Sequence, residues 1–220
     1  MSTTKQRPRP GGPVATRRSY TPFIVLGVIL VVAVGIALLA SSGGDDSADG
    51  GVDGGQLLST AGVTATGAQL PPLPEGGDDP AVGTAAPTLE GVSPAGQGTA
   101  VGFDQPTLIA FMAHWCPHCQ AELPELVELA ESGDLDELDA VVVLTGTDES
   151  APNYPPGPWV DREGWTGRVL LDDENGTAAS AFGLTSYPYL VLVDGDGNIV
   201  DRNAGGLGLD GLRDFVAQVG

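Results

Sequence analysis

Cysteine is scarce in this chain of 220 residues, which contains only Cys116 and Cys119. One pair excludes the disulfide scaffold of a small secreted domain, which needs several bridges. Basic residues are also few: Lys and Arg number 9 against 29 acids, and beyond residue 40 only four arginines oppose all of those acids. Such an acidic surface argues against nucleic acid or anionic lipid as a partner. It suits a positively charged partner or a salty exterior, and a surface that simply keeps the protein soluble is the simpler interpretation.

Acids are absent from the first 44 residues, where the chain has a different character. Residues 1–22 form a basic tail, and residues 23–40 are an uninterrupted run of apolar residues and glycine. This run is just long enough for a membrane-spanning helix and longer than the core of a typical signal peptide. The positive-inside rule then places the N-terminus in the cytoplasm and the rest of the chain outside. We predict a single-pass signal-anchor in the cell membrane.

Two other interpretations of the N-terminal segment stay open. Cleavage after Ser42, behind the small residues 40–42, would release a secreted protein. The Arg17-Arg18 pair faintly resembles a twin-arginine signal. All three interpretations export the part of the chain that carries the cysteines.

The domain organisation follows from composition. Residues 41–79 are rich in Gly, Asp, Ser, Thr and Pro and lack aromatics, which predicts a flexible acidic linker. Residues 80–220 are long enough to bury an adequate core without disulfides and are predicted as one extracytoplasmic domain. The four parts are therefore a tail (1–22), an anchor (23–40), a linker (41–79) and a domain (80–220).

Apolar patterning predicts alternating strands and helices within the domain. Residues 147–158 contain four prolines and are predicted as an irregular insertion, and residues 159–166 are compatible with a helix. A hairpin of 86–92 with 99–101 is expected at the start. Further strands are predicted at 107–113, 140–144, 168–172, 188–193 and 198–202, and helices at 117–131, 175–182 and 209–219.

The two cysteines lie where a buried strand gives way to a helix. Cys116 would then sit at the helix N-terminus, where unpaired N–H groups and the helix dipole stabilise a thiolate. Pro117 suits the first helical position. Cys119, one turn further along, is close enough to close a small disulfide ring. The pattern predicts a reversible dithiol–disulfide site in which Cys116 attacks and Cys119 resolves.

A family resemblance supports this interpretation. Residues 115–119, Trp-Cys-Pro-His-Cys, resemble the active site of thioredoxin-fold oxidoreductases, and residues 185–188, Thr-Ser-Tyr-Pro, resemble their cis-proline loop. Residues 122–124, Glu-Leu-Pro, are similar to the membrane-anchored TlpA/ResA-like branch. The likeness covers roughly residues 80–220. It implies an α/β thioredoxin fold, a central mixed sheet flanked by helices, that follows the transmembrane helix and linker.

The resemblance also implies an activity and its partners. The protein would be a protein disulfide oxidoreductase that exchanges disulfides with exported thiol/disulfide client proteins. A membrane redox partner would regenerate it, and no organic cofactor or metal is expected. The redox-active disulfide would be Cys116–Cys119.

Other site residues are assigned by the resemblance alone. Pro188 would be cis, and Tyr187, Pro188 and Trp115 would contact the client. Thioredoxins have a buried aspartate six residues before the first cysteine, where this chain has Ala110, so Glu122 or water would handle the proton of the resolving thiol. A solvent-facing carboxylate is the alternative for Glu122, and simple packing is the alternative for Trp115.

The direction of exchange depends on His118. A donor or partial cation at this position stabilises the Cys116 thiolate, which favours the reduced form and makes the disulfide more oxidising. The Pro-His pair resembles the oxidising DsbA-type motif, so the prediction leans to oxidation. Reduction, as in cytochrome c maturation, is the alternative, and so is an exposed histidine without effect.

Functions of other classes were weighed as well. The two cysteines with His114 and His118 could offer two sulfurs and a nitrogen to Cu(I) or Zn²⁺, as in a metal chaperone. Adjacent positions point in different directions and the sequence has no second ligand cluster, so no metal is predicted. An inert disulfide and a redox-inactive binding module on the same scaffold are the remaining alternatives.

Overall fold

The computed structural model of the chain describes residues 57–219. The predicted tail (1–22), anchor (23–40) and first part of the linker (41–56) lie outside this range. Among residues 57–219, no helix has both the length and the apolar character needed to cross a membrane. The elements in chain order are β1 (Thr64–Thr66), β2 (Thr88–Val92), β3 (Gly98–Val101), β4 (Thr107–Met112), α2 (Pro117–Glu131), β5 (Asp139–Leu144), α3 (Pro156–Arg162), β6 (Arg168–Leu171), α4 (Thr177–Ala181), β7 (Tyr189–Val193), β8 (Ile199–Ala204), α5 (Gly208–Val216) and η1 (Ala217–Val219).

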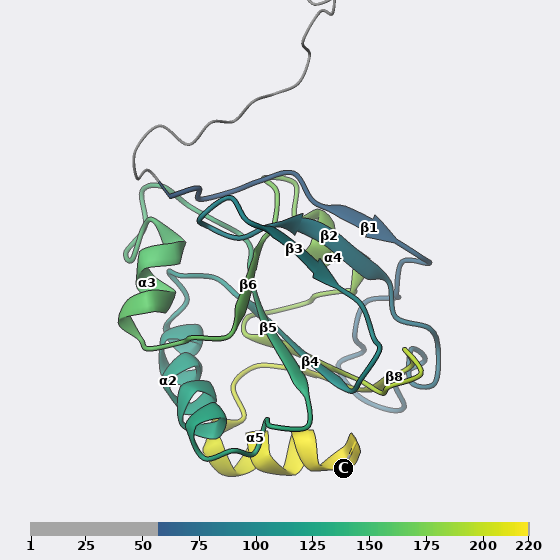
Figure 1. Cartoon of the computed structure of the whole chain (residues 1–220). Coiled ribbons are helices and arrows are strands. Elements are labelled where there is room, and N and C mark those ends of the chain that lie inside the picture. The colour runs from purple at the N-terminus through teal and green to yellow at the C-terminus, as the bar shows by residue number, and fades with distance from the viewer. Residues whose placement is uncertain (1–56, 220) are drawn as a thin grey trace, which may run out of the picture. The chain divides into compact units, whose positions relative to one another are not determined.

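A five-stranded mixed sheet forms the centre of the domain, with strand order β6-β5-β4-β7-β8. Strands β4, β5 and β6 run parallel, whereas β7 is antiparallel to both β4 and β8. A separate antiparallel sheet of order β1-β2-β3 lies beside it (Figure 1). The mixed sheet flanked by helices is the architecture that the sequence predicted.

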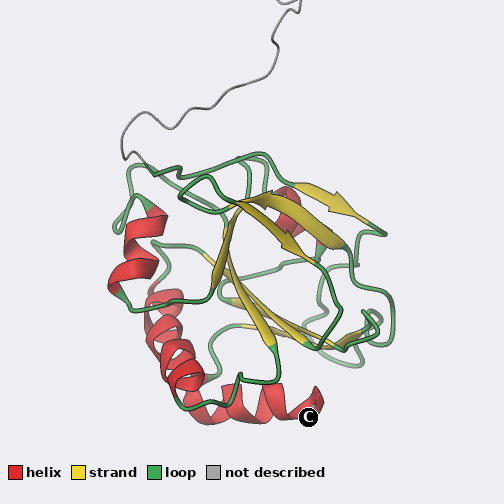
Figure 2. Ribbon diagram, viewed as in Figure 1, coloured by secondary structure: helices red, strands yellow, loops and turns green. Residues whose placement is uncertain are grey.

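Strand β4 divides the core into two layers because its side chains alternate between the faces of the sheet. All six of its residues are buried. Leu108 and Met112 join the cluster formed with α2, α3 and α5. Ile109 and Phe111 join the cluster formed with α4 and the smaller sheet. Figure 2 shows α2 and α5 together on one side of the sheet. Burial on both faces explains why this strand reads as a continuous apolar run.

Helix α2 begins and ends where the local signals predict. Pro117 occupies its first turn, and the helix runs through Pro124 to Glu131 before Gly133 adopts a positive φ of 87°. Its apolar stripe is buried at helical spacing against the sheet and α5, and each fully buried leucine contributes about 2 kcal/mol. Three residues carry that stripe: Leu123, Leu126 and Leu129.

The predicted linker is wrong for its last part. Residues 57–79 are ordered against the domain and include β1, which pairs antiparallel with β2. Leu70 is buried, and its N–H donates to the carbonyl of Ala181. Gly183 permits this close approach, since a Cβ there would lie 2.2 Å from the carbonyl oxygen of Pro71. A few apolar residues are enough to order this polar segment, because the rest of the domain supplies the surface that buries them.

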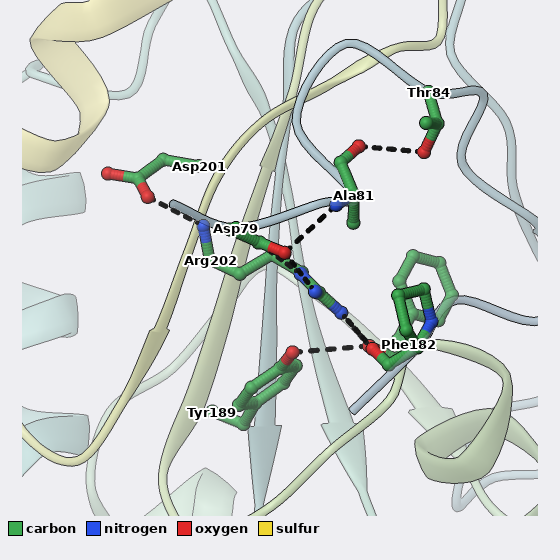
Figure 3. Close-up of polar contacts among 8 residues, drawn as sticks. Asp79, Ala81, Thr84, Phe182, Tyr189, Asp201 and Arg202 are labelled. Carbon is green, nitrogen blue, oxygen red and sulfur yellow. Dashed lines mark hydrogen bonds and ion pairs between the residues drawn. The ribbon is translucent and has the colours of Figure 1, made fainter. Parts of the chain in front are cut away.

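A buried ion pair fastens the end of the same segment (Figure 3). The Arg202 guanidinium, on β8, donates to both carboxylate oxygens of Asp79, at 2.7 and 2.5 Å. Its Nη1 also donates to the carbonyls of Pro71 and Phe182, each at 2.9 Å. The hydrogen bonds that Arg202 donates to Asp79 hold the pKa of Asp79 below its ordinary value. Residues 70–81 therefore belong to the folded domain, which starts earlier than residue 80.

Element boundaries elsewhere follow the prediction closely, with one shift in the insertion. Helix α3 starts at Pro156, inside the stretch predicted as irregular, and ends at Arg162. Proline favours the first turn of a helix because it has no N–H to leave unpaired. The part of the insertion without regular structure is therefore shorter, residues 147–155.

Candidate active site

Cys116 and Cys119 lie at the start of α2, as the sequence predicted. Cys116 is the residue just before the helix, with extended backbone angles, and its carbonyl accepts the N–H of Gln120 at 3.0 Å. Both cysteines are free thiols. Cys116 is 7% exposed and Cys119 is fully buried. The first sulfur therefore reaches the surface at the N-terminus of α2, and the second lies behind it in the core.

Burial separates the two thiols chemically. The Sγ of Cys119 accepts the N–H of Ala113 at 3.4 Å. Burial raises the pKa of Cys119 well above its ordinary value, and the negative charges that Cys116 and Glu122 can carry raise it further. Cys119 consequently keeps its proton while Cys116 faces an incoming partner.

The loop before β7 faces the first cysteine. The Tyr187–Pro188 peptide bond is cis, as the family resemblance implied. The Cys116 thiol donates to the carbonyl oxygen of Tyr187 at 3.7 Å, across 71 residues of chain. The ring of Tyr187 stands edge-on to Trp115, with ring centroids 5.8 Å apart. Trp115, Cys116, Tyr187 and Pro188 are thus brought together at one end of the sheet.

Comparisons with known proteins agree with this geometry. The family profile described as Redoxin matches residues 81–213. The chain belongs to the Redoxin family.

Several curated relatives of this Redoxin chain are named as thiol:disulfide interchange proteins. It is 34% identical over 100 residues to the "Thiol:disulfide interchange protein DsbE homolog" of Paracoccus denitrificans, a match that covers 46% of this chain and 51% of that protein. The chain thus spans about half the length of that relative. It is 27% identical over 195 residues to the "Thiol:disulfide interchange protein DsbE" of Pasteurella multocida, with 87% and 88% covered.

Solved structures show that the Redoxin domain has a thioredoxin-like α/β fold. StoA from Bacillus subtilis superposes with a TM-score of 0.50 at 21% identity, covering 62% of this chain and 98% of StoA. A thiol:disulfide interchange protein from Bacteroides sp. superposes with a TM-score of 0.51 at 20% identity, covering 63% and 89%. At such identities the likeness concerns the fold alone.

Glu122 of the Redoxin domain is buried, so the solvent-facing alternative is wrong. It is 3% exposed, and its carboxylate accepts the N–H groups of Leu207 and Gly208 at 2.9 and 3.1 Å. These donors lie at the N-terminus of α5, where backbone N–H groups lack partners within the helix. Glu122 therefore joins α2 to α5 and places a carboxylate near Cys119. Ala110 lies in the core of β4 and supplies no proton acceptor.

The remaining predicted residues lie at the surface beside Cys116. His118 is exposed, and its side chain makes no hydrogen bond with any residue in the range 57–219. Trp115 is also exposed, and its indole N–H donates to the carbonyl of Gly146 at 2.7 Å. This bond connects the active-site loop to Gly146, directly before the insertion, a contact that local sequence patterns do not reveal.

Sequence reasoning assigned no positional role to His114. Its side chain is 1% exposed, although Trp115 beside it faces solvent. The Nδ1 lies 2.7 Å from the carbonyl oxygen of Pro152, and the Nε2 accepts the N–H of Asp148 at 3.2 Å. The position of His114, two residues before the first cysteine, was the only local signal of this role. Its partners lie 34 and 38 residues further along the chain, where no local pattern identifies them.

A cleft of about 600 Å³ adjoins the cis-proline loop of the Redoxin domain. Tyr187 lines it on one side, the insertion lines it with Glu149, and the loop before α4 contributes Asp173 and Glu174. No lysine or arginine is among the residues that line it. The cleft therefore presents carboxylates beside the loop that faces Cys116.

Proposed function

We propose that the protein is an extracytoplasmic thiol–disulfide oxidoreductase that exchanges disulfides with exported proteins through Cys116 and Cys119. The observation that carries this proposal is the contact between the Cys116 thiol and the carbonyl of Tyr187. It aligns a sulfur at a helix N-terminus with backbone that can pair with an extended client segment. The Redoxin family and the names of the relatives support the same activity.

The mechanism is two successive thiol–disulfide exchanges. The Cys116 thiolate attacks one sulfur of a client disulfide, and the other client sulfur leaves as a thiolate. Cys119 then loses its proton and attacks the Cys116 sulfur, which releases the second client sulfur and closes the Cys116–Cys119 disulfide. Two electrons pass to the client. Oxidation of a client dithiol is the same sequence in reverse.

The assignment of roles to the two sulfurs rests on exposure and helix position. Cys116 reaches the surface and lies at the positive end of the α2 dipole, which stabilises its thiolate. Cys119 is fully buried and protonated, so it acts only on a disulfide that already includes Cys116. Glu122 is proposed to take up the Cys119 proton, with water as the alternative, since no aspartate occupies position 110.

Residues 23–40 are proposed to anchor the domain to the cell membrane, with residues 1–22 on the cytoplasmic side. The charge asymmetry across residues 23–40 supports this orientation. The acidic cleft beside Tyr187 favours clients that carry basic residues near the reacting cysteine, because opposite charges attract. A membrane redox partner would restore the oxidation state of the dithiol after each turnover.

The direction of exchange is proposed to be oxidation. His118 sits beside Cys116 at the helix N-terminus, where a donor or cation stabilises the thiolate and lowers the stability of the disulfide. The alternative is a reductant of cytochrome apoproteins or other oxidised clients. The names DsbE and ResA among the relatives are the observation that keeps this alternative in view.

A metal chaperone is disfavoured by the geometry around the motif. Both ring nitrogens of His114 face backbone groups of the insertion. In residues 57–219 no three side chains of His, Cys, Asp or Glu are grouped so that they could hold a metal ion. The dithiol is therefore proposed to act by sulfur exchange.

The reduction potential of the Cys116–Cys119 pair tests both the activity and its direction. The full chain is equilibrated with glutathione buffers, and its thiols are quantified by alkylation and mass. A potential near −120 mV assigns an oxidant and one near −270 mV a reductant. A pair that fails to equilibrate, together with no reduction of insulin, contradicts the proposed function.

A further inference from the structure

His114 and Trp115 are the two central residues of a turn that precedes the nucleophile. The N–H of Cys116 donates to the carbonyl of Ala113 at 3.0 Å, which closes a four-residue turn around them. The conformation of this turn sets the direction in which Cys116 enters α2. Any group that holds His114 and Trp115 therefore controls the position of the Cys116 sulfur.

Residues 146–153 hold both of these side chains. The His114 ring bonds to Pro152 and Asp148, and the carbonyl of His114 accepts the side-chain amide of Asn153 at 3.2 Å. The Trp115 indole N–H donates to Gly146. Four hydrogen bonds thus connect the two central residues of this turn to a segment more than 30 residues further along the chain.

The partners of the His114 ring fix its chemical form. A carbonyl oxygen can only accept, so the Nδ1 facing Pro152 carries a hydrogen. A backbone N–H can only donate, so the Nε2 facing Asp148 carries a lone pair. The ring is the neutral Nδ1–H tautomer, with both nitrogens occupied. It is consequently unavailable for proton transfer or metal binding, and its role is positional.

Tyr154 covers this arrangement from the outside. Its ring meets the His114 ring at 61°, with centroids 6.1 Å apart, and it is one of the few exposed large apolar side chains of the domain. Its hydroxyl donates to Glu149 at 3.4 Å. Burial of His114 beneath it makes an unpaired ring nitrogen costly, since a buried donor or acceptor without a partner loses about 1–3 kcal/mol.

We propose that His114 is the positioning residue through which the insertion aligns Cys116 for attack. The neutral ring joins Asp148 and Pro152 to the turn and thereby limits the positions that the Cys116 sulfur samples. No residue of the insertion takes part in the exchange steps. Its role is to hold the turn that positions Cys116. This inference rests on the proposed function for its significance, but it concerns a geometry that can be tested separately.

Three substitutions separate the contributions of the ring. His114→Phe keeps an aromatic ring and removes both hydrogen bonds. His114→Asn places an amide donor where the Nδ1 bonds to Pro152, and His114→Gln places an amide oxygen where the Nε2 accepts from Asp148. Tyr154→Phe is the matched control, because it alters the same insertion and keeps the ring that covers His114.

The rate constant for alkylation of Cys116 by iodoacetamide is measured on each full-chain variant, under conditions where circular dichroism shows it folded. His114→Phe is expected to lower this rate constant about tenfold, the equivalent of about 1.4 kcal/mol. His114→Asn and His114→Gln are expected to recover part of the loss, and Tyr154→Phe to react at the wild-type rate. Exchange with glutathione disulfide should follow the same order.

Two results overturn the inference. One is a folded His114→Phe protein that is alkylated at the wild-type rate. The other is a slow His114→Phe protein whose rate neither the Asn nor the Gln variant recovers, because the size and shape of the imidazole, which none of the three variants keeps, would then explain the loss without its hydrogen bonds. A wild-type protein that is alkylated readily but never exchanges with a disulfide contradicts the proposed function instead.

Discussion

The thiol of Cys116 donates a hydrogen bond to the backbone carbonyl of Tyr187, 71 residues away in the chain. This contact brings the strand–helix junction after β4 together with the loop before β7, which are adjacent because β4 and β7 pair in the sheet. Backbone next to the reactive sulfur is available to a client in extended conformation. Recognition and chemistry therefore share one edge of the domain.

Trapping distinguishes the two sulfurs. In Cys119→Ser the mixed disulfide between Cys116 and a client cannot be resolved, so covalent complexes should accumulate, whereas Cys116→Ser should trap none. The complexes are counted on non-reducing gels after expression of each full-chain variant. Equal trapping by the two variants would refute the assigned roles.

His118→Pro tests the origin of the redox potential. His118 is exposed at the N-terminus of α2, and its side chain makes no hydrogen bond within residues 57–219, so we expect its effect on Cys116 to be electrostatic. Proline removes the donor and is tolerated in the first turn of a helix. The potential should become more negative by about 30 mV, a tenfold change in the equilibrium constant. An unchanged value in glutathione buffers would remove His118 from the mechanism.

Glu122→Gln should affect both the thiol and the fold. Burial keeps the pKa of Cys119 above its ordinary value, and removing the Glu122 charge should lower that pKa. Thiolate absorbance measured against pH in Cys116→Ser, with and without the substitution, detects the shift. The weaker bonds to Leu207 and Gly208 should cost about 1.5 kcal/mol of unfolding free energy. A Cys119 titration that does not move would contradict this coupling.

Asp79→Asn tests whether the segment before residue 80 belongs to the domain. It leaves Arg202 buried without a counter-charge, and we expect a loss of about 3 kcal/mol in the free energy of unfolding. Asp78→Asn, at the exposed neighbouring position, is the matched control and should cost nothing measurable. Denaturant titration of both variants measures these losses. Equal stabilities would contradict the stabilising role of the Asp79–Arg202 ion pair.

The same pair predicts the direction of acid sensitivity. The bonds from Arg202 hold the pKa of Asp79 below that of an unfolded aspartate, about 3.9. The folded state therefore gains stability from this carboxylate above that value and loses it as the pH falls through the lower folded pKa. The Asp79→Asn protein should lack this component, so its stability should fall less than that of the wild type as the pH drops below about 3.9.

Much of the fold was predictable because its signals are local. The continuous apolar run at 107–112 is typical of a strand buried on both faces, and Pro117 marks the start of α2. The order of the two cysteines relative to the helix start indicated which sulfur would be the more exposed one. Strand β1 was missed because Thr-Ala-Thr is too short and too weakly apolar to indicate a strand, and it forms one only where β2 lies beside it.

The site residues also divide into those that a local motif predicts and those that depend on distant partners. Cys116, Cys119 and Pro188 lie in short motifs, so their grouping could be predicted from a family resemblance. The partners of Glu122 lie 85 and 86 residues away, and those of His114 lie 34 and 38 residues away. No local pattern specifies which backbone N–H a buried side chain will meet.

By itself the sequence determined the dithiol, the helix that begins at it and the alternation of strands and helices, because each depends on residues within a few positions of one another. Only the tertiary structure decided that residues 57–79 join the domain, that Glu122 caps α5, and that the insertion holds His114. Each of those outcomes pairs a buried polar group with a distant partner. Such pairings exist only once the chain has folded and excluded the water that would otherwise satisfy them.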